Sequence, residues 1–228
     1  MAKVKIGVIG CGSIANAAHI PSYMDCPDAE IKYFCDIIKE RADKAVEDYK
    51  CGIAVEDYHD VINDPEVDAV SVCTPNLMHK IISVDALRAG KHVLCEKPAA
   101  RIYSEALEMQ QAQKETGKVL NIGVVNRFNA QVNEVRRKIL AGELGEVYHV
   151  FVNFRAHRSI PASAALSPPR RSPAAACSST GACTASTLLC TALAILSPFP
   201  SAARPSASWA LIFPTTHTAE CGRSRPWI

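Results

Sequence analysis

The chain is 228 residues long, with 21% charged residues, 48% hydrophobic residues and a formal net charge of +2 at pH 7. A charge this close to zero gives no reason to expect a nucleic-acid or membrane partner. Lys3 and Lys5 lead into a short apolar run interrupted by three glycines, which is not the pattern of a secretory signal. We therefore expect a cytoplasmic protein.

Six apolar segments separated by helical stretches predict an alternating α/β fold. The first segment is apolar and β-branched, as expected of a buried parallel strand. Residues 104–116 are typical of a helix, with Ser104 as its N-cap. Strands that alternate with helices indicate a doubly wound parallel sheet. The predicted strands are residues 4–10, 30–38, 52–55, 68–74, 92–95 and 119–125.

The first predicted strand runs into the sequence Gly10-Cys11-Gly12-Ser13-Ile14-Ala15, a GxGxxA glycine-rich turn. Gly10 permits the tight turn, Gly12 lets the backbone approach a pyrophosphate, and Ala15 keeps helix and strand close. The N-terminus of the next helix offers N–H groups and a positive dipole to phosphates. A purely structural glycine turn would have a similar sequence, so the pattern alone is weak.

Asp36, at the end of the second predicted strand, strengthens this interpretation. A carboxylate at that point can accept hydrogen bonds from ribose hydroxyls, and it repels a 2′-phosphate. This favours NAD over NADP. The alternative is that Asp36 is a solvated acid at a strand end.

Two further loops follow the fourth and fifth predicted strands, where ligands bind in such sheets. The first loop contains Thr74-Pro75-Asn76 and His79, and it could also be a turn with a helix cap. The second is Glu96-Lys97-Pro98. A lysine there can donate to a substrate hydroxyl and stabilise an alkoxide, whereas the alternative is a surface ion pair of Glu96 with Lys97.

Taken together, GxGxxA, Asp36, TPNxxH and EKP resemble the Gfo/Idh/MocA family of NAD(P)-dependent oxidoreductases, from residue 3 to about residue 161. The resemblance implies a Rossmann-type domain over residues 1–122 and the start of a second α/β domain over residues 123–160. It implies sugar, polyol or related alcohol substrates and a homo-oligomer formed through the second-domain sheet. Lys97 would be the catalytic residue, and Lys97 and Arg127 would bind substrate. The implied cofactor-binding residues are Gly10, Gly12, Ser13, Ile14, Asp36, Thr74, Asn76, His79, Glu96 and Lys97.

Residues 161–228 have a different composition from the rest of the chain. Ala, Ser, Thr and Pro fill 42 of these 68 positions, and Glu220 is the one acidic residue. Cys177, Cys183 and Cys190 lack metal-ligand spacing and no CxxC motif occurs, so we expect no metal site. A long chain without a secretory signal also favours reduced thiols over disulfides. The apolar residues follow neither a helical nor a strand period for long, and prolines interrupt any membrane span.

A shift of reading frame explains this segment better than a natural Ser/Pro/Ala linker. Read one base out of frame, the codons for residues 173–188 are compatible with GGGVLIDWGVHRLDL. This string contains the glycine triplet and the DxGxH segment that complete the catalytic site in the family. We therefore expect residues 161–228 to be an out-of-frame tail and not a native domain.

Two functions remain open from the sequence. The first is an oxidoreductase that transfers hydride between NAD and a sugar or polyol hydroxyl, inactive in this form because the DxGxH histidine is missing. The second is a non-catalytic dinucleotide-binding sensor or scaffold, for which this chain is the genuine product.

Overall fold

The computed structural model of the chain describes residues 2–149. The chain divides into two units, one ending at Gly123 and the other starting at Val124. The predicted out-of-frame tail, residues 161–228, lies outside the described residues, as do residues 150–160 of the predicted start of the second domain.

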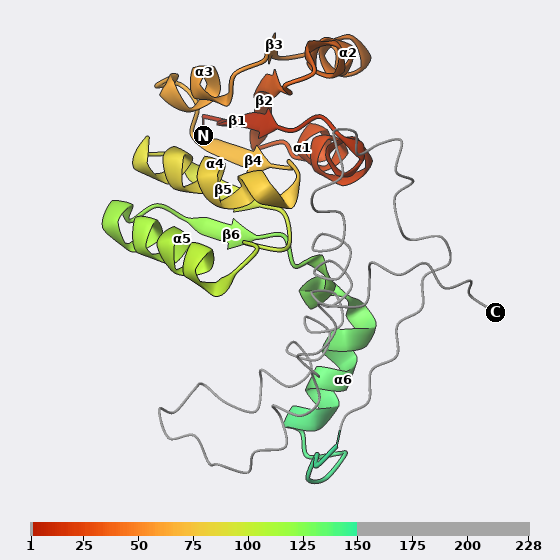
Figure 1. The fold of residues 1–228 in the computed structure, drawn as a ribbon. Coiled ribbons are helices and arrows are strands. Elements are labelled where there is room, and N and C mark those ends of the chain that lie inside the picture. Colours follow the sequence, from red (N-terminus) through yellow and green to blue (C-terminus); the bar gives the residue numbers. More distant parts are fainter. Residues whose placement is uncertain (1, 150–228) are drawn as a thin grey trace, which may run out of the picture. The chain divides into compact units, whose positions relative to one another are not determined.

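The first unit is built on a six-stranded parallel sheet. Its strand order is β3-β2-β1-β4-β5-β6, so the direction of winding reverses between β1 and β4 (Figure 1). This confirms the predicted doubly wound, Rossmann-type sheet. The strands are β1 (Val4–Ile9), β2 (Ala29–Cys35), β3 (Ile53–Val55), β4 (Ala69–Val72), β5 (His92–Cys95) and β6 (Leu120–Ile122).

Two strands, β2 and β6, end three residues earlier than the sequence pattern predicts. β2 stops at Cys35 and not at residue 38, because the Asp36 carboxylate accepts a hydrogen bond from the Ile38 N–H at 2.9 Å and turns the chain toward the next helix. β6 stops at Ile122. The Gly123 N–H still donates to the Cys95 carbonyl at 2.7 Å, and a short 3-10 helix begins two residues later.

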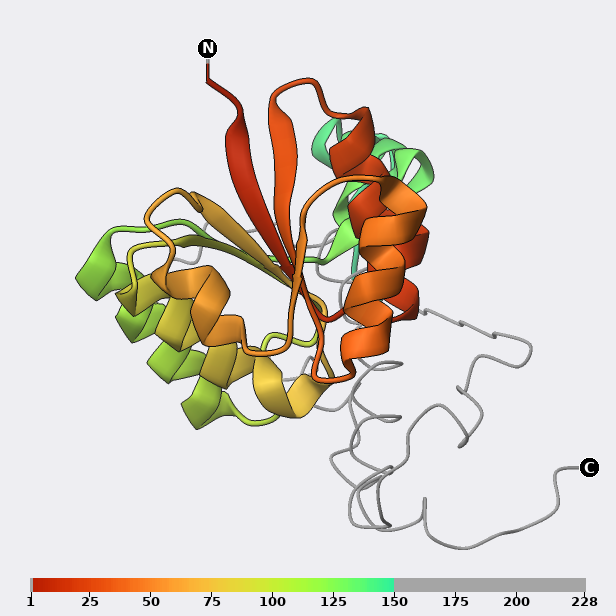
Figure 2. The same ribbon diagram turned by 90° about the horizontal axis from the view of Figure 1, so that it is seen from above.

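Helices cover both faces of the sheet (Figure 2). One face is covered by the helix that follows the glycine turn and by α2, and the other by α3, α4 and α5. The first of these helices contains a π-helical segment, a departure from the regular helix that the sequence predicts. The elements are η1 (Ala15–His19), α1 (Ile20–Asp25), α2 (Lys39–Tyr49), α3 (Tyr58–Asn63), α4 (Asn76–Arg88) and α5 (Tyr103–Thr116).

Each face of the sheet has its own apolar core. Between the sheet and the helices η1, α1 and α2, the side chains of Ile20 and Phe34 are fully buried. Between the sheet and α3, α4 and α5, the buried side chains include Val70, Leu87 and Met109. Burying one such side chain contributes about 1.5–3 kcal/mol relative to leaving it exposed. The two cores therefore hold the carboxyl ends of the strands, and the loops that follow them, on a rigid base.

The predicted N-cap of α5 is wrong by two residues. The N-cap is Ile102, which makes no side-chain capping bond, and Ser104 lies inside the first turn. The Glu105 carboxylate instead accepts a hydrogen bond from the Arg101 N–H at 3.1 Å, so an acid in the first turn satisfies a backbone donor at this end. The helix ends at Gly117, which takes a left-handed φ of 65°.

The described part of the second unit consists of two helical segments. These are η2 (Val125–Phe128) and α6 (Ala130–Leu140). Asn129 caps α6, because its side-chain oxygen accepts hydrogen bonds from the N–H groups of Gln131 and Val132 at 3.0 and 3.1 Å. Arg127, a predicted substrate-binding residue, lies exposed in η2.

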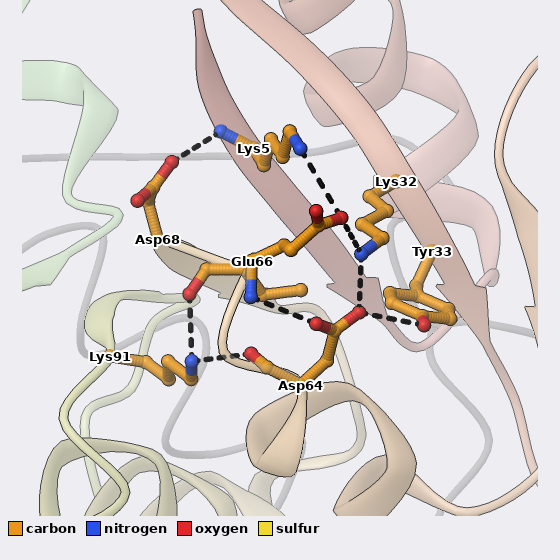
Figure 3. Close-up of polar contacts among 8 residues, drawn as sticks. Lys5, Lys32, Tyr33, Asp64, Glu66, Asp68 and Lys91 are labelled. Atoms are coloured by element: carbon orange, nitrogen blue, oxygen red, sulfur yellow. Dashed lines mark hydrogen bonds and ion pairs between the residues drawn. The ribbon is translucent and has the colours of Figure 1, made fainter.

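A cluster of charged residues lies at the amino end of the sheet, remote from the glycine turn (Figure 3). Lys32 Nζ lies 2.5 Å from both Asp64 Oδ2 and Glu66 Oε2, and it lowers the pKa of Asp64 to about 2. Lys91 is the buried member of the cluster. Its Nζ donates to the carbonyl oxygens of Asp64 and Val67 at 2.6 and 2.8 Å, and burial lowers its pKa. Lys91 therefore anchors the loop before β4 to the start of β5.

We expect Lys91→Met to lower the free energy of unfolding by about 1–3 kcal/mol, because it leaves the carbonyls of Asp64 and Val67 without their donor. Urea denaturation of the full chain, followed by circular dichroism, measures the change. The control is Lys114→Met, which removes an exposed lysine from α5 and should stay within about 0.5 kcal/mol. Equal stability of the two variants would contradict the assigned role of Lys91.

Candidate dinucleotide site

The glycine turn lies at the point where the strand order reverses. Gly10 has a left-handed φ of 97°, and its N–H donates to the Cys35 carbonyl at 2.7 Å. A Cβ on Gly10 would lie 2.8 Å from the carbonyl carbon and oxygen of Cys73 and 2.9 Å from the Thr74 nitrogen. Both the backbone angle and the space therefore require glycine here. The turn is held between the ends of β2 and β4, where such sheets bind ligands.

Gly12 differs from Gly10, because a Cβ built on it would meet no atom within 4 Å. The backbone at Gly12 therefore faces open space, as close approach of a pyrophosphate requires. Ser13 and Ile14 follow on the exposed side, whereas Ala15 is completely buried against the sheet. The first N–H groups of a helix have no acceptor within the helix, so this end can donate to an anion.

Asp36 is buried and bound to the backbone around it. Asp36 is only 8% exposed. Its Oδ2 accepts a hydrogen bond from the Cys11 N–H at 2.9 Å, and its Oδ1 accepts one from the Ile38 N–H at 2.9 Å. The alternative of a solvated strand-end acid is therefore wrong. Burial and, next, the Asp36 charge raise the pKa of the Cys11 thiol to about 12, so this thiol stays neutral beside the carboxylate.

The loop after β4 carries a buried hydroxyl without a partner. Within the described part of the chain, no group hydrogen-bonds to Thr74 Oγ1. Burying a hydroxyl unpaired is unfavourable, and a polar ligand at the reversal point could supply the missing partner. Asn76 begins α4, and Pro75 at the N-cap makes no side-chain bond. The open space at Gly12 and the orphaned hydroxyl at Thr74 both fit a dinucleotide.

His79 ties this loop to the next one. Its ring is 1% exposed, with Nδ1 lying 2.7 Å from the Pro98 carbonyl oxygen and Nε2 lying 2.7 Å from the Thr74 carbonyl oxygen. His79 lies in the first turn of α4, and its ring joins the loop after β4 to the loop after β5. With both ring nitrogens engaged, His79 positions the loops and presents no free donor at the surface.

Glu96 does not form the surface ion pair with Lys97 that the sequence left open. Glu96 is only 7% exposed, and its Oε1 lies 2.9 Å from His19 Nε2. Oε2 accepts from the Lys97 N–H at 3.1 Å, which fixes the backbone of the half-buried Lys97 just before its cis peptide bond to Pro98. Burial alone would raise the pKa of Glu96, but the hydrogen bonds from His19 and Lys97 lower it.

Sequence reasoning missed His19. Its Nδ1 lies 2.8 Å from Ser71 Oγ, while hydrogen bonding to Cys73 and then to Glu96 raises the pKa of His19 to about 9. A signal was present in the sequence: His19 follows the buried Ala15 by four residues, so both lie on the helix face that meets the sheet. The imidazole, however, contacts residues far along the chain, and no local pattern reports them.

Gly123 makes room for the Glu96 carboxylate. A Cβ on Gly123 would lie 3.0 Å from Glu96 Oε1, tighter than an ordinary contact. The sequence predicted Gly123 only as part of a strand, so this packing role is new. No group of three or more His, Cys, Asp or Glu residues in the described ranges could hold a metal ion. None of the helices over residues 2–149 is long and apolar enough to cross a membrane.

The reversed strand order, the glycine turn at the reversal point and the acid after β2 define a dinucleotide-binding domain of the Rossmann type. Comparison with known proteins narrows this class. The model of an oxidoreductase family with an NAD-binding Rossmann fold, Gfo/Idh/MocA, matches residues 4–124. The chain belongs to the Gfo/Idh/MocA family.

Its curated relatives include dehydrogenases of sugars and polyols. D-glucoside 3-dehydrogenase of Escherichia coli is 33% identical over 145 residues, which are 64% of this chain and 41% of the relative. Inositol 2-dehydrogenase of Salmonella paratyphi B is 32% identical over 149 residues, which are 63% of this chain and 43% of the relative. The chain thus matches about two fifths of the length of these relatives.

Solved structures show the same fold with either cofactor. The WlbA dehydrogenase of Chromobacterium violaceum, in complex with NADH and UDP-GlcNAcA, has a TM-score of 0.61 and 29% identity over 65% of this chain and 43% of that one. A 3-ketoreductase of Actinomadura kijaniata, in complex with NADP and TDP-benzene, has a TM-score of 0.58 and 31% identity over 61% of this chain and 43% of that one. These neighbours do not distinguish NAD from NADP for this chain.

Proposed function

We propose that this chain carries the cofactor site of an oxidoreductase that transfers hydride between NAD and the hydroxyl-bearing carbon of a sugar or polyol. The observation that carries the proposal is the arrangement of Gly12, Asp36 and Lys97. They stand on the loops after β1, β2 and β5, at the carboxyl ends of the strands, where ligands bind in such sheets. The sugar and inositol dehydrogenases among the relatives support the substrate class.

Each part of the site has a proposed task. The turn from Gly10 to Ile14 binds the pyrophosphate through the helix N-terminus, and Asp36 accepts hydrogen bonds from the adenosine ribose. Thr74 and Asn76 contact the cofactor, with the unpaired Thr74 hydroxyl as one donor. Glu96 and His79 hold the two loops in position.

Lys97 is the proposed catalytic residue and also contacts substrate. When bound, the nicotinamide supplies the hydride acceptor. The Lys97 ammonium would donate to the substrate hydroxyl and stabilise negative charge on that oxygen. The hydroxyl proton would pass to a general base, the role of the DxGxH histidine that the shifted reading frame allows. Arg127 is proposed as a second substrate contact on the strength of the family resemblance.

The buried carboxylate of Asp36 supports NAD as the cofactor, because a 2′-phosphate would bring further negative charge next to it. We expect the full chain to bind NADH about tenfold or more tightly than NADPH, as measured by titration of nucleotide fluorescence. Asp36→Ala should narrow this difference.

The control for that titration is Asp43→Ala, which removes the same charge from the exposed Lys39–Asp43 pair on α2. The preference of this control variant for NADH over NADPH should match that of the unaltered chain. Tighter binding of NADPH by the unaltered chain, or the same preference in the Asp36→Ala variant, would contradict the role of Asp36.

We further propose that residues 161–228 are translated out of frame and that this form of the chain has no dehydrogenase activity. Support comes from the composition of the segment and from the DxGxH motif in the shifted frame. Loss of a positioned general base typically costs about 10²- to 10⁴-fold in rate. Sequencing the DNA around codons 158–165 tests the proposal: an inserted or missing base supports it, and an intact frame refutes it.

A further inference from the structure

A polar network joins the helix after the glycine turn to the loop that carries Lys97. The imidazole of His19, in η1, bridges Ser71 Oγ at 2.8 Å and Glu96 Oε1 at 2.9 Å. The second carboxylate oxygen, Oε2, holds the Lys97 N–H at 3.1 Å. The network therefore runs from the cofactor-binding helix through one histidine and one carboxylate to the backbone of the proposed catalytic lysine.

This network is shielded from water. The side chains of His19 and Glu96 are 8% and 9% exposed, so their attraction is screened little by solvent. Gly123 lets β6 approach the carboxylate closely, since a Cβ there would lie only 3.0 Å from Glu96 Oε1. Both oxygens of the carboxylate are engaged, one with His19 and the other with the Lys97 N–H, so Glu96 is a rigid support for the loop.

We propose that His19 is a positioning residue that couples the dinucleotide-binding helix to Lys97. The histidine fixes the carboxylate of Glu96, which in turn fixes the backbone of Lys97 at the carboxyl end of β5. Because His19 stands on the helix whose N-terminus binds the pyrophosphate, binding of cofactor there tightens the Lys97 loop. The inference rests on the proposed function for its cofactor step, but the network itself is independent of that function.

The charge state of His19 follows from its surroundings. The titratable and charged groups that face it are Tyr23 from α1, Cys73 after β4 and Glu96 after β5. Hydrogen bonding to Cys73 and to Glu96 raises the pKa of the imidazole to about 9, against the opposing effect of burial. His19 is thus a cation at neutral pH, and it loses its hold on Glu96 as the pH rises through about 9.

Amide exchange gives a direct test on the full chain. His19→Gln should accelerate exchange of the Lys97 amide several-fold, because that amide donates to Glu96 Oε2. The neighbouring Glu96 amide donates to the Val72 carbonyl at 3.0 Å, within the sheet, and should keep its rate. A control variant, His59→Gln, removes an exposed histidine that pairs with Asp57 and should change neither rate. Equal acceleration of both amides would show a general loss of stability and overturn the proposal.

A second measurement needs no variant and covers the case in which His19→Gln does not fold. The ring nitrogens of His19, followed by NMR against pH in the unaltered chain, should titrate near 9. In Glu96→Gln the midpoint should be lower, because Glu96 is one of the two hydrogen-bonding partners that raise the pKa of His19. The same midpoint in both proteins would show that His19 does not hold Glu96 and would overturn the proposal.

Addition of NADH separates this inference from the proposed function. NADH should slow exchange of the Lys97 amide in the unaltered chain and have a much smaller effect in His19→Gln. If NADH does not bind, the proposed function fails. The exchange rates of the Lys97 amide in the unaltered chain and in His19→Gln, both without cofactor, still test the positioning role of His19. If NADH binds and slows Lys97 equally in both proteins, His19 does not couple the two sites.

Discussion

Replacement of Gly10 by alanine should lower the free energy of unfolding of the full chain by about 2–5 kcal/mol. The left-handed φ of 97° costs a residue with a Cβ about 1–2 kcal/mol. The new Cβ would also lie 2.8 Å from the backbone of Cys73, and such overpacking costs about 1–3 kcal/mol more. Urea denaturation followed by circular dichroism measures the loss.

Gly117→Ala is the matched control for this substitution. Gly117 also has a positive φ, 65°, but a Cβ there would meet no atom within 4 Å. Its cost should be limited to the backbone strain of about 1–2 kcal/mol. Equal losses of unfolding free energy in Gly10→Ala and Gly117→Ala would contradict the close approach of the glycine turn to the end of β4.

Glu96→Gln should lower the free energy of unfolding by about 3 kcal/mol near pH 6, because it leaves the buried His19 cation without its carboxylate. The pKa of His19 is raised to about 9 when folded, so this stabilisation is complete below about pH 6.5 and is lost as the pH rises through 9. The pKa of Glu96 is lowered, so the pair also loses stability at acid pH as that carboxylate protonates.

The difference between the unaltered chain and Glu96→Gln should therefore be largest near pH 6 and narrow to about 1 kcal/mol by pH 10, where a neutral hydrogen bond remains. Urea denaturation at pH 6, 8 and 10 follows this change. A difference that is constant over the three values would show that His19 carries no charge in the folded chain.

The fold could be predicted from the sequence because its signals are local. The apolar strand at the start of the chain, the glycines at 10 and 12 and the alternation of strands and helices each reflect residues close together in the chain. These local signals were sufficient to predict the doubly wound parallel sheet that the structure shows. The ends of β2 and β6 were less predictable, because hydrogen bonds such as Asp36 to Ile38 decide them.

Local sequence signals predicted only part of the candidate site. Asp36 and Lys97 could be named because they stand at strand ends in recognisable motifs. The pairing of His19 with Glu96 could not, since 77 residues separate them and the sheet order alone brings them together. For the same reason, the sequence offered Lys97 as the ion-pair partner of Glu96, whereas its partner in the structure is the buried His19.

Binding of NADH to the full chain and to its Gly12→Val variant tests the central claim most directly. A side chain at Gly12 would enter open space, so Gly12→Val should change the free energy of unfolding by no more than about 0.5 kcal/mol. The same side chain would block the approach of a pyrophosphate to the backbone. We predict saturable binding of NADH by the unaltered chain and affinity at least about tenfold weaker in the equally stable variant. Absence of saturable binding to the unaltered chain, or equal affinity in the two proteins, would contradict a dinucleotide site at this turn.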